Sequence, residues 1–550
     1  MSAAGARALA MCLALALAAC SRQAAPPGTR GAGTISVGQS LASTQSLDRT
    51  LDDYPRSLDP QLTTDIPSQR VLDDLFEGLV TLGIDGRPVP GAAASWQHSS
   101  DSRTWVFHLR DNARWSNGAA VTAGDFVYSW RREVDPKTGS GYAQALAPIV
   151  NGLDIASGHK PPETLGVEAT DAHTLTVHLT TPTPYLLDLL DQVYLYPVYQ
   201  PAIERYGDDW VRPEHLVCNG AFTLAEDVIG NRLTLQANAH YWDAAHVALR
   251  RVTYYSMPDR AQAVLRYLAG EVQFTDSFAA SQRPWLKRTL GEQVVNSPWL
   301  GIYMLAFNVR EPPFRDNLPL RQALVMAVDR RALTRYLKYD MYEPADTLMP
   351  PLPGYRPQHP QWAGLSLDAR NALAKKLYAQ AGYSATHPLR VDISTSIQGA
   401  DERHFLEAVA AMWHSVLGAQ IGVDESEFKV LLQNRELHRL PLFLDSWIGD
   451  FADPVNFLQL FDSRSSLDYG GYQGVRFDAL LDQAALEPDN TLRYGLLEQA
   501  EQALDADAVY LPLYYYATRH LVKPYVRGWQ SNLLDRNLSR YMFILEHQGN

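Results

Sequence analysis

Helical and strand patterns alternate between residues 366 and 425, and this alternation constrains the fold more than any other feature of the sequence. Helical patterns cover residues 366–383 and 401–418, and strand patterns cover 388–394 and 419–425. Ser366 suits an N-cap, and the strand patterns alternate apolar with polar side chains, as half-buried strands do. Helix, strand, helix and strand in one stretch predict an α/β fold.

An earlier segment has the same character. The stretch "TWVFHLRDNARWSNGAAVTAGDFVYSWRRE" begins with a strand pattern and reaches a turn at Asn117 and Gly118. A helix then follows, for which Thr122 is the expected N-cap and Asp125 the third helical residue.

The first residues have the pattern of an export signal. Arg7 is followed by a short apolar run that ends in "LAAC", and the polar, Pro- and Gly-rich "SRQAAPPGTRGAGT" comes next. The run is too short to span a bilayer as a mature helix. A lipobox with cleavage before Cys20 and lipidation of Cys20 is favoured over an ordinary secretory signal with a chance cysteine. Residues 1–19 are then a signal peptide and 20–34 a flexible tether.

Composition limits what the remaining chain can do. Roughly 530 residues remain, enough for several domains, and no later run approaches about 18 uninterrupted apolar residues. Cys218 is the only other mature cysteine, so no intramolecular disulfide is expected. The net charge of −13 argues against nucleic acid and against electrostatic binding to anionic lipid.

The stretch "WIGDFADPVNFLQLF" places Asp450 and Asp453 among apolar and aromatic residues without a basic neighbour. The two aspartates could be a catalytic pair, a metal site, turn residues or a receptor for a positive charge. Two carboxylates without a nearby histidine or third acidic ligand make a poor metal site, and their spacing alone does not make an acid/base pair. Asp453 precedes Pro454 and a helix-like run, which suits an N-cap with proline at the first helical position.

Several segments resemble, in order, those of a known family. They are "SLDPQLTTD", "VLDDLFEGLVT", "GRPVPGAAASW", "TWVFHLRDNARWSNGAAVTAGDFVYSW", "CNGAFTL", "YWDA", "PFRDNLPLRQALVMAVDR" and "WIGDFADPVNF". From about Leu58 to the C-terminus, the chain resembles the dipeptide- and oligopeptide-binding proteins of ABC importers, the extracellular solute-binding proteins of family 5.

The resemblance implies a bilobed, three-domain periplasmic-binding-protein fold of type II that closes over a peptide by hinge motion. Residues 35–76, 205–300 and 515–550 would form lobe I, residues 77–204 an inserted small domain, and residues 301–514 lobe II.

The resemblance also implies which residues meet the constant groups of a peptide. Asp450 matches the family's amine-binding aspartate. Backbone pairing would come from Thr64 to Ile66 and from the strand Asp445 to Gly449. Arg403 matches an arginine that holds the C-terminal carboxylate in dipeptide-binding relatives, although an exposed arginine at a helix start is an equal alternative.

At other positions the residues of this chain either match those of the family or differ from them. Trp447, Tyr142 and Tyr303 match aromatic residues that line the pocket, with core packing as the alternative. Relatives that bind longer peptides have cations at two positions where this chain has Glu311 and Leu444, although Arg310 is adjacent to the first. This difference favours short peptides as ligands. The family's paired cysteines are replaced by Gly301 and Ile448.

Other functions have less support in the sequence. A hydrolase would need a nucleophile elbow or a His-Glu-x-x-His motif, and neither is present, so no enzyme activity and no cofactor are expected. Related binders take nickel complexes, haem, murein peptides or oligosaccharides, and fold alone does not decide between them. Expected partners are short peptides and an ABC permease, and the protein is expected to be a lipid-anchored, periplasmic monomer.

Overall fold

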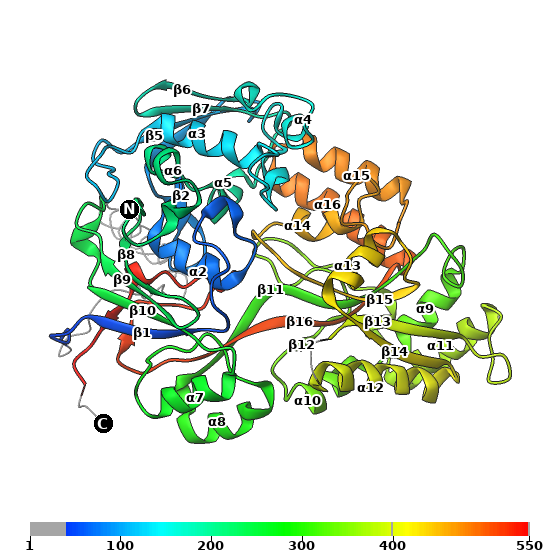
Figure 1. Ribbon diagram of the computed structural model, residues 1–550. Coiled ribbons are helices and arrows are strands. Elements are labelled where there is room, and N and C mark those ends of the chain that lie inside the picture. The colour runs from blue at the N-terminus through cyan, green and yellow to red at the C-terminus, as the bar shows by residue number, and fades with distance from the viewer. Residues whose placement is uncertain (1–39, 398–399, 548–550) are drawn as a thin grey trace, which may run out of the picture.

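The computed structural model describes residues 40–397 and 400–547 (Figure 1). The predicted signal peptide, the tether and Cys20 lie outside the described residues. In the part of the chain that is described, no helix combines the length and apolarity that crossing a membrane requires.

The first lobe contains a four-stranded sheet of order β1-β10-β9-β8, in which β1 runs parallel to β10. Its strands are β1 (Ser46–Leu51), β8 (Phe222–Val228), β9 (Arg232–Ala237) and β10 (Arg251–Ser256). Its helices are α2 (Ile66–Leu75), α7 (Arg260–Leu268) and α8 (Arg283–Leu290). Near the C-terminus β17 (Val526–Arg527) pairs with β18 (Phe543–Ile544), so the chain end returns to this lobe.

A smaller unit lies between the segments of this lobe in sequence. It holds the sheet β4-β5-β7-β6, formed by β4 (Ala93–His98), β5 (Thr104–Leu109), β6 (Val167–Asp171) and β7 (Thr174–His178). A short hairpin, β2 (Val80–Leu82) with β3 (Pro88–Pro90), precedes it. Its helices are α3 (Ala123–Val134), α4 (Gly152–Ala156), α5 (Leu186–Leu190) and α6 (Gln200–Tyr206). The predicted capping of α3 is confirmed, because the Thr122 N–H donates to Asp125 Oδ2 at 2.7 Å.

The second lobe is built on a six-stranded sheet of order β12-β16-β11-β15-β13-β14. Its strands are β11 (Val294–Phe307), β12 (Glu343–Pro344), β13 (Arg390–Ser396), β14 (Gln420–Ser426), β15 (Leu442–Ile448) and β16 (Tyr510–Leu521). Its helices are α9 (Leu318–Met326), α10 (Arg330–Leu337), α11 (Leu367–Gln380), α12 (Ala400–Leu417), α13 (Phe428–Glu436), α14 (Val455–Leu458), α15 (Val475–Leu486) and α16 (Asn490–Asp507).

The alternation predicted for residues 366–425 is confirmed by α11, β13, α12 and β14. Ser366 Oγ accepts the Ala369 N–H at the start of α11, as an N-cap does. The strands β13 and β14 are parallel neighbours, which requires a crossover connection, and α12 supplies it. The fold class is α/β.

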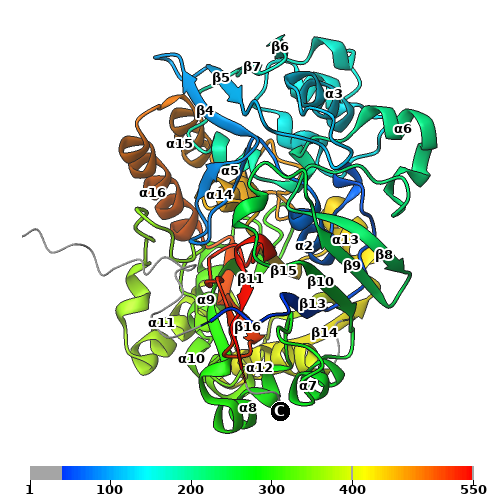
Figure 2. The ribbon, with the colours of Figure 1, turned by 90° about the vertical axis from the view of Figure 1, so that its left-hand side faces the viewer.

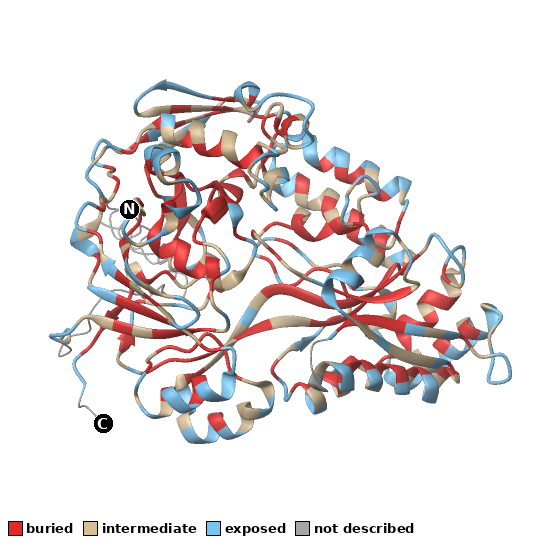
Figure 3. Cartoon of the chain, viewed as in Figure 1, coloured by how far each residue is buried: buried red, intermediate tan, exposed pale blue. Residues whose placement is uncertain are grey.

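Two long strands, β11 and β16, run side by side between the lobes in both ribbon views (Figures 1 and 2). Their pairing has register shifts, one of them between Pro298 and Ile302. Residues 300–307 of β11 and 510–514 of β16 are buried, whereas residues 295–299 of β11 are half-buried or exposed (Figure 3). The predicted domain boundaries after residues 300 and 514 fall inside these two strands, and the division of the chain into those domains stays a prediction.

Candidate functional site

Two adjoining cavities lie where the lobes meet. The smaller, about 140 Å³, is lined by residues that include Thr64, Tyr142, Gln192 and Asp450. The larger, about 360 Å³, is lined by residues of the first lobe, by Trp299 of β11, by Tyr342 and by residues of β16. Both cavities share four lining residues, Ile66, Arg70, Trp299 and Asp535, and therefore lie on either side of one wall in the cleft between the lobes.

Asp450 stands just after the end of β15, in the wall of the smaller cavity. Its N–H donates to Asn456 Oδ1 at 3.3 Å, and its carbonyl accepts from Gln192 Nε2 at 2.7 Å, so its backbone is held from both sides. Among the described residues, no Lys, Arg or His pairs with its carboxylate. Burial raises the pKa of this carboxyl to about 6. Asp450 is half-buried. A poorly solvated carboxylate without a cation is costly, and a ligand ammonium would remove that cost.

Asp453 has a different environment. Arg493 Nη1 and Nη2 reach its two carboxylate oxygens at 2.7 and 2.6 Å, and both side chains are buried. Asp453 Oδ1 also accepts the Val455 N–H at 2.9 Å, so Asp453 has a structural role at the start of α14, but the N-cap is Pro454 and the predicted cap position was wrong by one residue. No sequence signal indicated Arg493, which comes from the first turn of α16.

Trp447 and Gly449 shape the loop that carries Asp450. The Trp447 indole N–H donates to Asn456 Oδ1 at 2.7 Å, and this oxygen also accepts the Asp450 N–H. Trp447 lines neither of the two cavities, whereas Gly449 lines the smaller one. A Cβ atom at Gly449 would lie 2.8 Å from Leu300 Cδ2, so the loop approaches β11 too closely for a larger residue.

Tyr142, Thr64 and Ile66 lie opposite this loop and line the smaller cavity. Tyr142 stacks on Tyr194, with ring centroids 4.4 Å apart. Burial, with the negative charge of Asp450 and Asp65, raises the pKa of the Tyr142 hydroxyl. Ile66 is the first residue of α2, and Thr64 is exposed to the cleft just before it.

Two residues implied by the resemblance lie away from these cavities. Arg403, on α12, is half exposed and paired with Glu407 at 2.9 Å and with Glu425. Tyr303 is 2% exposed and stacks on Tyr514, with centroids 4.7 Å apart. Their ligand contacts stay predictions.

The remaining family positions hold Glu311, Leu444, Gly301 and Ile448. Glu311 is exposed and Leu444 is buried, so neither contributes a cation to the cleft. Gly301 and Ile448 are partners on the antiparallel strands β11 and β15, which is the spacing that a pair of cysteines would need. Cys218 is buried and free.

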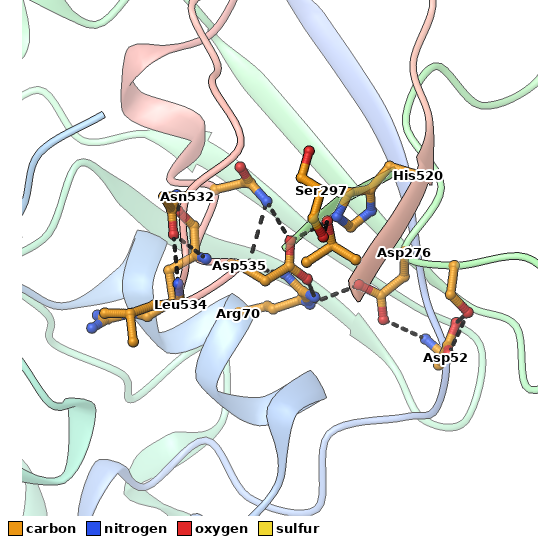
Figure 4. A network of polar contacts seen from close by, with 12 residues as sticks. Asp52, Arg70, Asp276, Ser297, His520, Asn532, Leu534 and Asp535 are labelled. Atoms are coloured by element: carbon orange, nitrogen blue, oxygen red, sulfur yellow. Dashed lines mark hydrogen bonds and ion pairs between the residues drawn. The ribbon is translucent and has the colours of Figure 1, made fainter. Parts of the chain in front are cut away.

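The wall shared by the two cavities rests on a buried ionic network (Figure 4). Arg70 Nε lies 2.6 Å from Asp276 Oδ1, and Arg70 Nη2 lies 2.6 Å from Asp535 Oδ2. His520 Nε2 lies 2.7 Å from Asp535 Oδ1, while its Nδ1 faces the Thr275 carbonyl at 3.0 Å. Because both ring nitrogens face acceptors, the imidazolium form fits this site.

The pKa values of the network agree with that assignment. Burial opposes the charge of His520, but Asp535 outweighs it and raises the pKa of the ring. Burial likewise opposes the ionisation of Asp535, but His520 and Arg70 hold its pKa well below the usual range. The network joins α2, β16 and the C-terminal segment. Sequence reasoning missed it because its members are distant along the chain and carry no local motif.

Known proteins share this sequence and architecture. The family model "Bacterial extracellular solute-binding proteins, family 5 Middle" matches residues 87–468. The chain is 36% identical over 523 residues to the periplasmic oligopeptide-binding protein of Escherichia coli (strain K12), covering 94% of this chain and 95% of that protein. It is 37% identical over 522 residues to the periplasmic murein peptide-binding protein of the same organism, covering 94% and 96%.

Solved structures extend the comparison. The murein tripeptide-binding protein of Escherichia coli superposes with a TM-score of 0.81 at 36% identity, covering 92% of this chain and 100% of the other. The Haemophilus influenzae oligopeptide-binding protein in complex with RPPGFSPFR gives a TM-score of 0.80 at 32% identity, covering 92% and 100%.

Proposed function

The chain belongs to family 5 of the bacterial extracellular solute-binding proteins, and on that premise we propose that it binds short peptides in the interlobe cleft and delivers them to an ABC importer. The relatives above are named as periplasmic peptide-binding proteins. We propose the same compartment and ligand class for this chain, with no catalytic activity of its own.

The observation that carries the proposal is the unpaired carboxylate of Asp450. Every peptide with a free N-terminus offers an ammonium, whatever its side chains, so one buried carboxylate can recognise many sequences. Asp450 faces a cavity, is held by its backbone, and has a pKa that burial raises to about 6. Nearby Asp453 already has Arg493 and cannot serve this purpose.

The remaining parts of the proposal come from the sequence. Cys20 would carry a lipid that holds the mature protein at a membrane surface, with residues 20–34 as a tether, and the protein would act as a monomer with a membrane permease.

A second candidate ligand is a murein peptide. The chain is as similar to a murein peptide-binding protein as to an oligopeptide-binding protein, at 37% and 36% identity. A murein peptide with a free amine would meet the same Asp450.

Calorimetric titration tests the proposal with di-, tri- and tetrapeptides, a murein tripeptide, and N-acetylated versions of each. We expect N-acetylation and Asp450→Asn each to weaken binding about a hundredfold or more, because each removes a desolvated ion pair. Equal binding of acetylated and free peptides would show that Asp450 is not an amine receptor. Preference for the murein tripeptide would select the second candidate.

Two controls separate binding from folding. Asp316→Asn changes a carboxyl that is 94% exposed and is expected to bind peptides as the wild type does. The melting temperature of Asp450→Asn at pH 7.5 is expected to equal or exceed that of the wild type, because the substitution removes an unpaired, half-buried charge.

A further inference from the structure

Arg519 is a half-buried cation in the wall of the larger cavity. It lies on β16, opposite Asn296 of β11. Its Nη1 donates to the Tyr342 hydroxyl at 3.1 Å and approaches the Met341 sulfur at 3.8 Å. Among the side chains that the structure describes, those of residues 40–397 and 402–547, no carboxylate pairs with this guanidinium.

The other arginines of this cavity either have carboxylate partners or are exposed to water. Arg70 is held by Asp276 and Asp535, and Arg260 by Asp52 at 2.8 Å. Arg56 has no carboxylate partner in the described part of the chain but is exposed to water, where an unpaired charge costs little.

The carboxylates of the cavity leave Arg519 without a counterion. Asp52, Asp276 and Asp535 are paired as described. Asp65 caps α2 by accepting the Ser68 N–H at 2.9 Å and the Ser68 hydroxyl at 2.8 Å, and Asp53 is exposed. Each is either engaged or in water.

A second donor lies on the shared wall. The buried Trp299 Nε1 has no acceptor among the described residues, and Trp299 lines both cavities. The smaller cavity thus offers an unpaired carboxylate, and the larger offers an unpaired guanidinium. Trp299, which lines both cavities, offers an indole N–H.

We propose that Arg519 receives a carboxylate of the bound ligand, with the Tyr342 hydroxyl orienting the guanidinium. This rests on the proposed function, because the amino group at Asp450 fixes the other end of the peptide. The cleft then selects peptides that carry a carboxylate in addition to their free amine. That carboxylate comes either from the C-terminus of a short peptide or from an acidic side chain. Arg403, which already has two glutamate partners, is not needed for this contact.

Matched peptide pairs distinguish the two sources of the carboxylate. Ala-Ala against Ala-Ala-amide tests the C-terminus, and Ala-Glu-Ala against Ala-Gln-Ala tests the side chain. In calorimetric titrations we expect the carboxylate to improve the affinity of the wild type about tenfold or more in at least one pair. In Arg519→Gln that advantage is expected to fall below about twofold, while the amide or glutamine peptide binds as before.

Arg527→Gln is the matched control, since it removes an exposed arginine from the same C-terminal part of the chain. It is expected to keep the discrimination. Melting temperatures of both variants check that they fold.

Two results would overturn the inference. In the first, Arg519→Gln still prefers the carboxylate peptide of a pair. In the second, the wild type shows Asp450-dependent peptide binding but prefers the carboxylate peptide in neither pair. Absence of any Asp450-dependent binding would instead contradict the proposed function, and the two failures are therefore distinguishable.

Discussion

Asp450 and Asp453 share one short loop and one chemical group, but their surroundings separate their roles. Asp453 is neutralised by Arg493 and accepts the first N–H of α14, so its charge is used within the fold. Asp450 is fixed by contacts to its backbone, while its carboxylate has no cation among the described residues. The loop therefore contains one structural aspartate and one that faces the cleft.

The raised pKa of Asp450 predicts how peptide affinity depends on pH. The ammonium binds the ionised carboxylate, so Asp450 must lose its proton before the peptide binds once the pH is below about 6. Affinity is expected to be nearly constant between about pH 7 and 7.5 and to fall by up to about tenfold per pH unit below 6. Tyr142 and Tyr194 face the same carboxyl, but burial raises their pKa values and keeps them neutral.

Calorimetry in buffers of different ionisation enthalpy measures this effect, because peptide binding at about pH 5.5 should release a proton to the buffer. The residual affinity of Asp450→Asn should lack the slope. A wild-type affinity that is the same at pH 5 and 7 would contradict the assignment.

Residues that act through local sequence could be predicted, and residues that act through distant partners could not. The cap at Thr122 and the role of Asp453 follow from neighbouring residues, and Asp450 was identified by family resemblance. The partners of Arg493, Arg70 and His520 come together only in the folded chain. Arg519 has no motif, and only its lack of a partner in the cavity singles it out.

Among the elements, β11 and β16 cross from one lobe to the other beside the cleft. Trp299 and Gly301 lie where the pairing of these strands shifts register, and Tyr516 packs there from β16. The periodic segments that form α11, β13, α12 and β14 were predictable because each has apolar side chains at helical or strand spacing that pack on the core of the second lobe. The mixed polar and apolar residues of β11 gave no comparable signal, because its two halves lie in different surroundings.

Gly301 is expected to be essential to this crossing. A Cβ atom there would lie 2.8 Å from Tyr516 Cδ2 and 2.9 Å from the Trp447 carbonyl oxygen. Gly301→Ala should therefore lower the free energy of unfolding by about 1–3 kcal/mol, as overpacking does. It should also weaken peptide binding, because Tyr516 lines the larger cavity.

Gly495→Ala provides the control in chemical denaturation. Gly495 lies inside α16 with no atom within 4 Å of the added Cβ, so alanine should raise the free energy of unfolding by about 0.5–1 kcal/mol. Equal stability of Gly301→Ala and the wild type would show that β11 and its neighbours can relax.

At the scale of the whole molecule, the unit that contains α5 touches the Asp450 loop from across the cleft. Tyr185 stacks on Phe451, with ring centroids 5.1 Å apart and an angle of 4° between the planes. Gln192 donates to the Asp450 carbonyl. These contacts connect the loop of Asp450, the proposed amine receptor, to the unit that contains α5. The resemblance could predict a bilobed closing protein, but not these contacts between α5, its neighbours and the Asp450 loop.

Tyr185→Ala tests this link, since Tyr185 lines neither cavity. Loss of the aromatic stack should reduce the population of the binding-competent arrangement and weaken peptide affinity about two- to tenfold, mainly through faster dissociation. Stopped-flow binding gives the rates, and small-angle X-ray scattering with and without peptide reports closure. Tyr336→Ala, at a position that is 70% exposed on α10, should change neither. If Tyr185→Ala releases peptide at the wild-type rate, the stack does not help to hold the cleft closed, and Gln192 becomes the remaining contact to test.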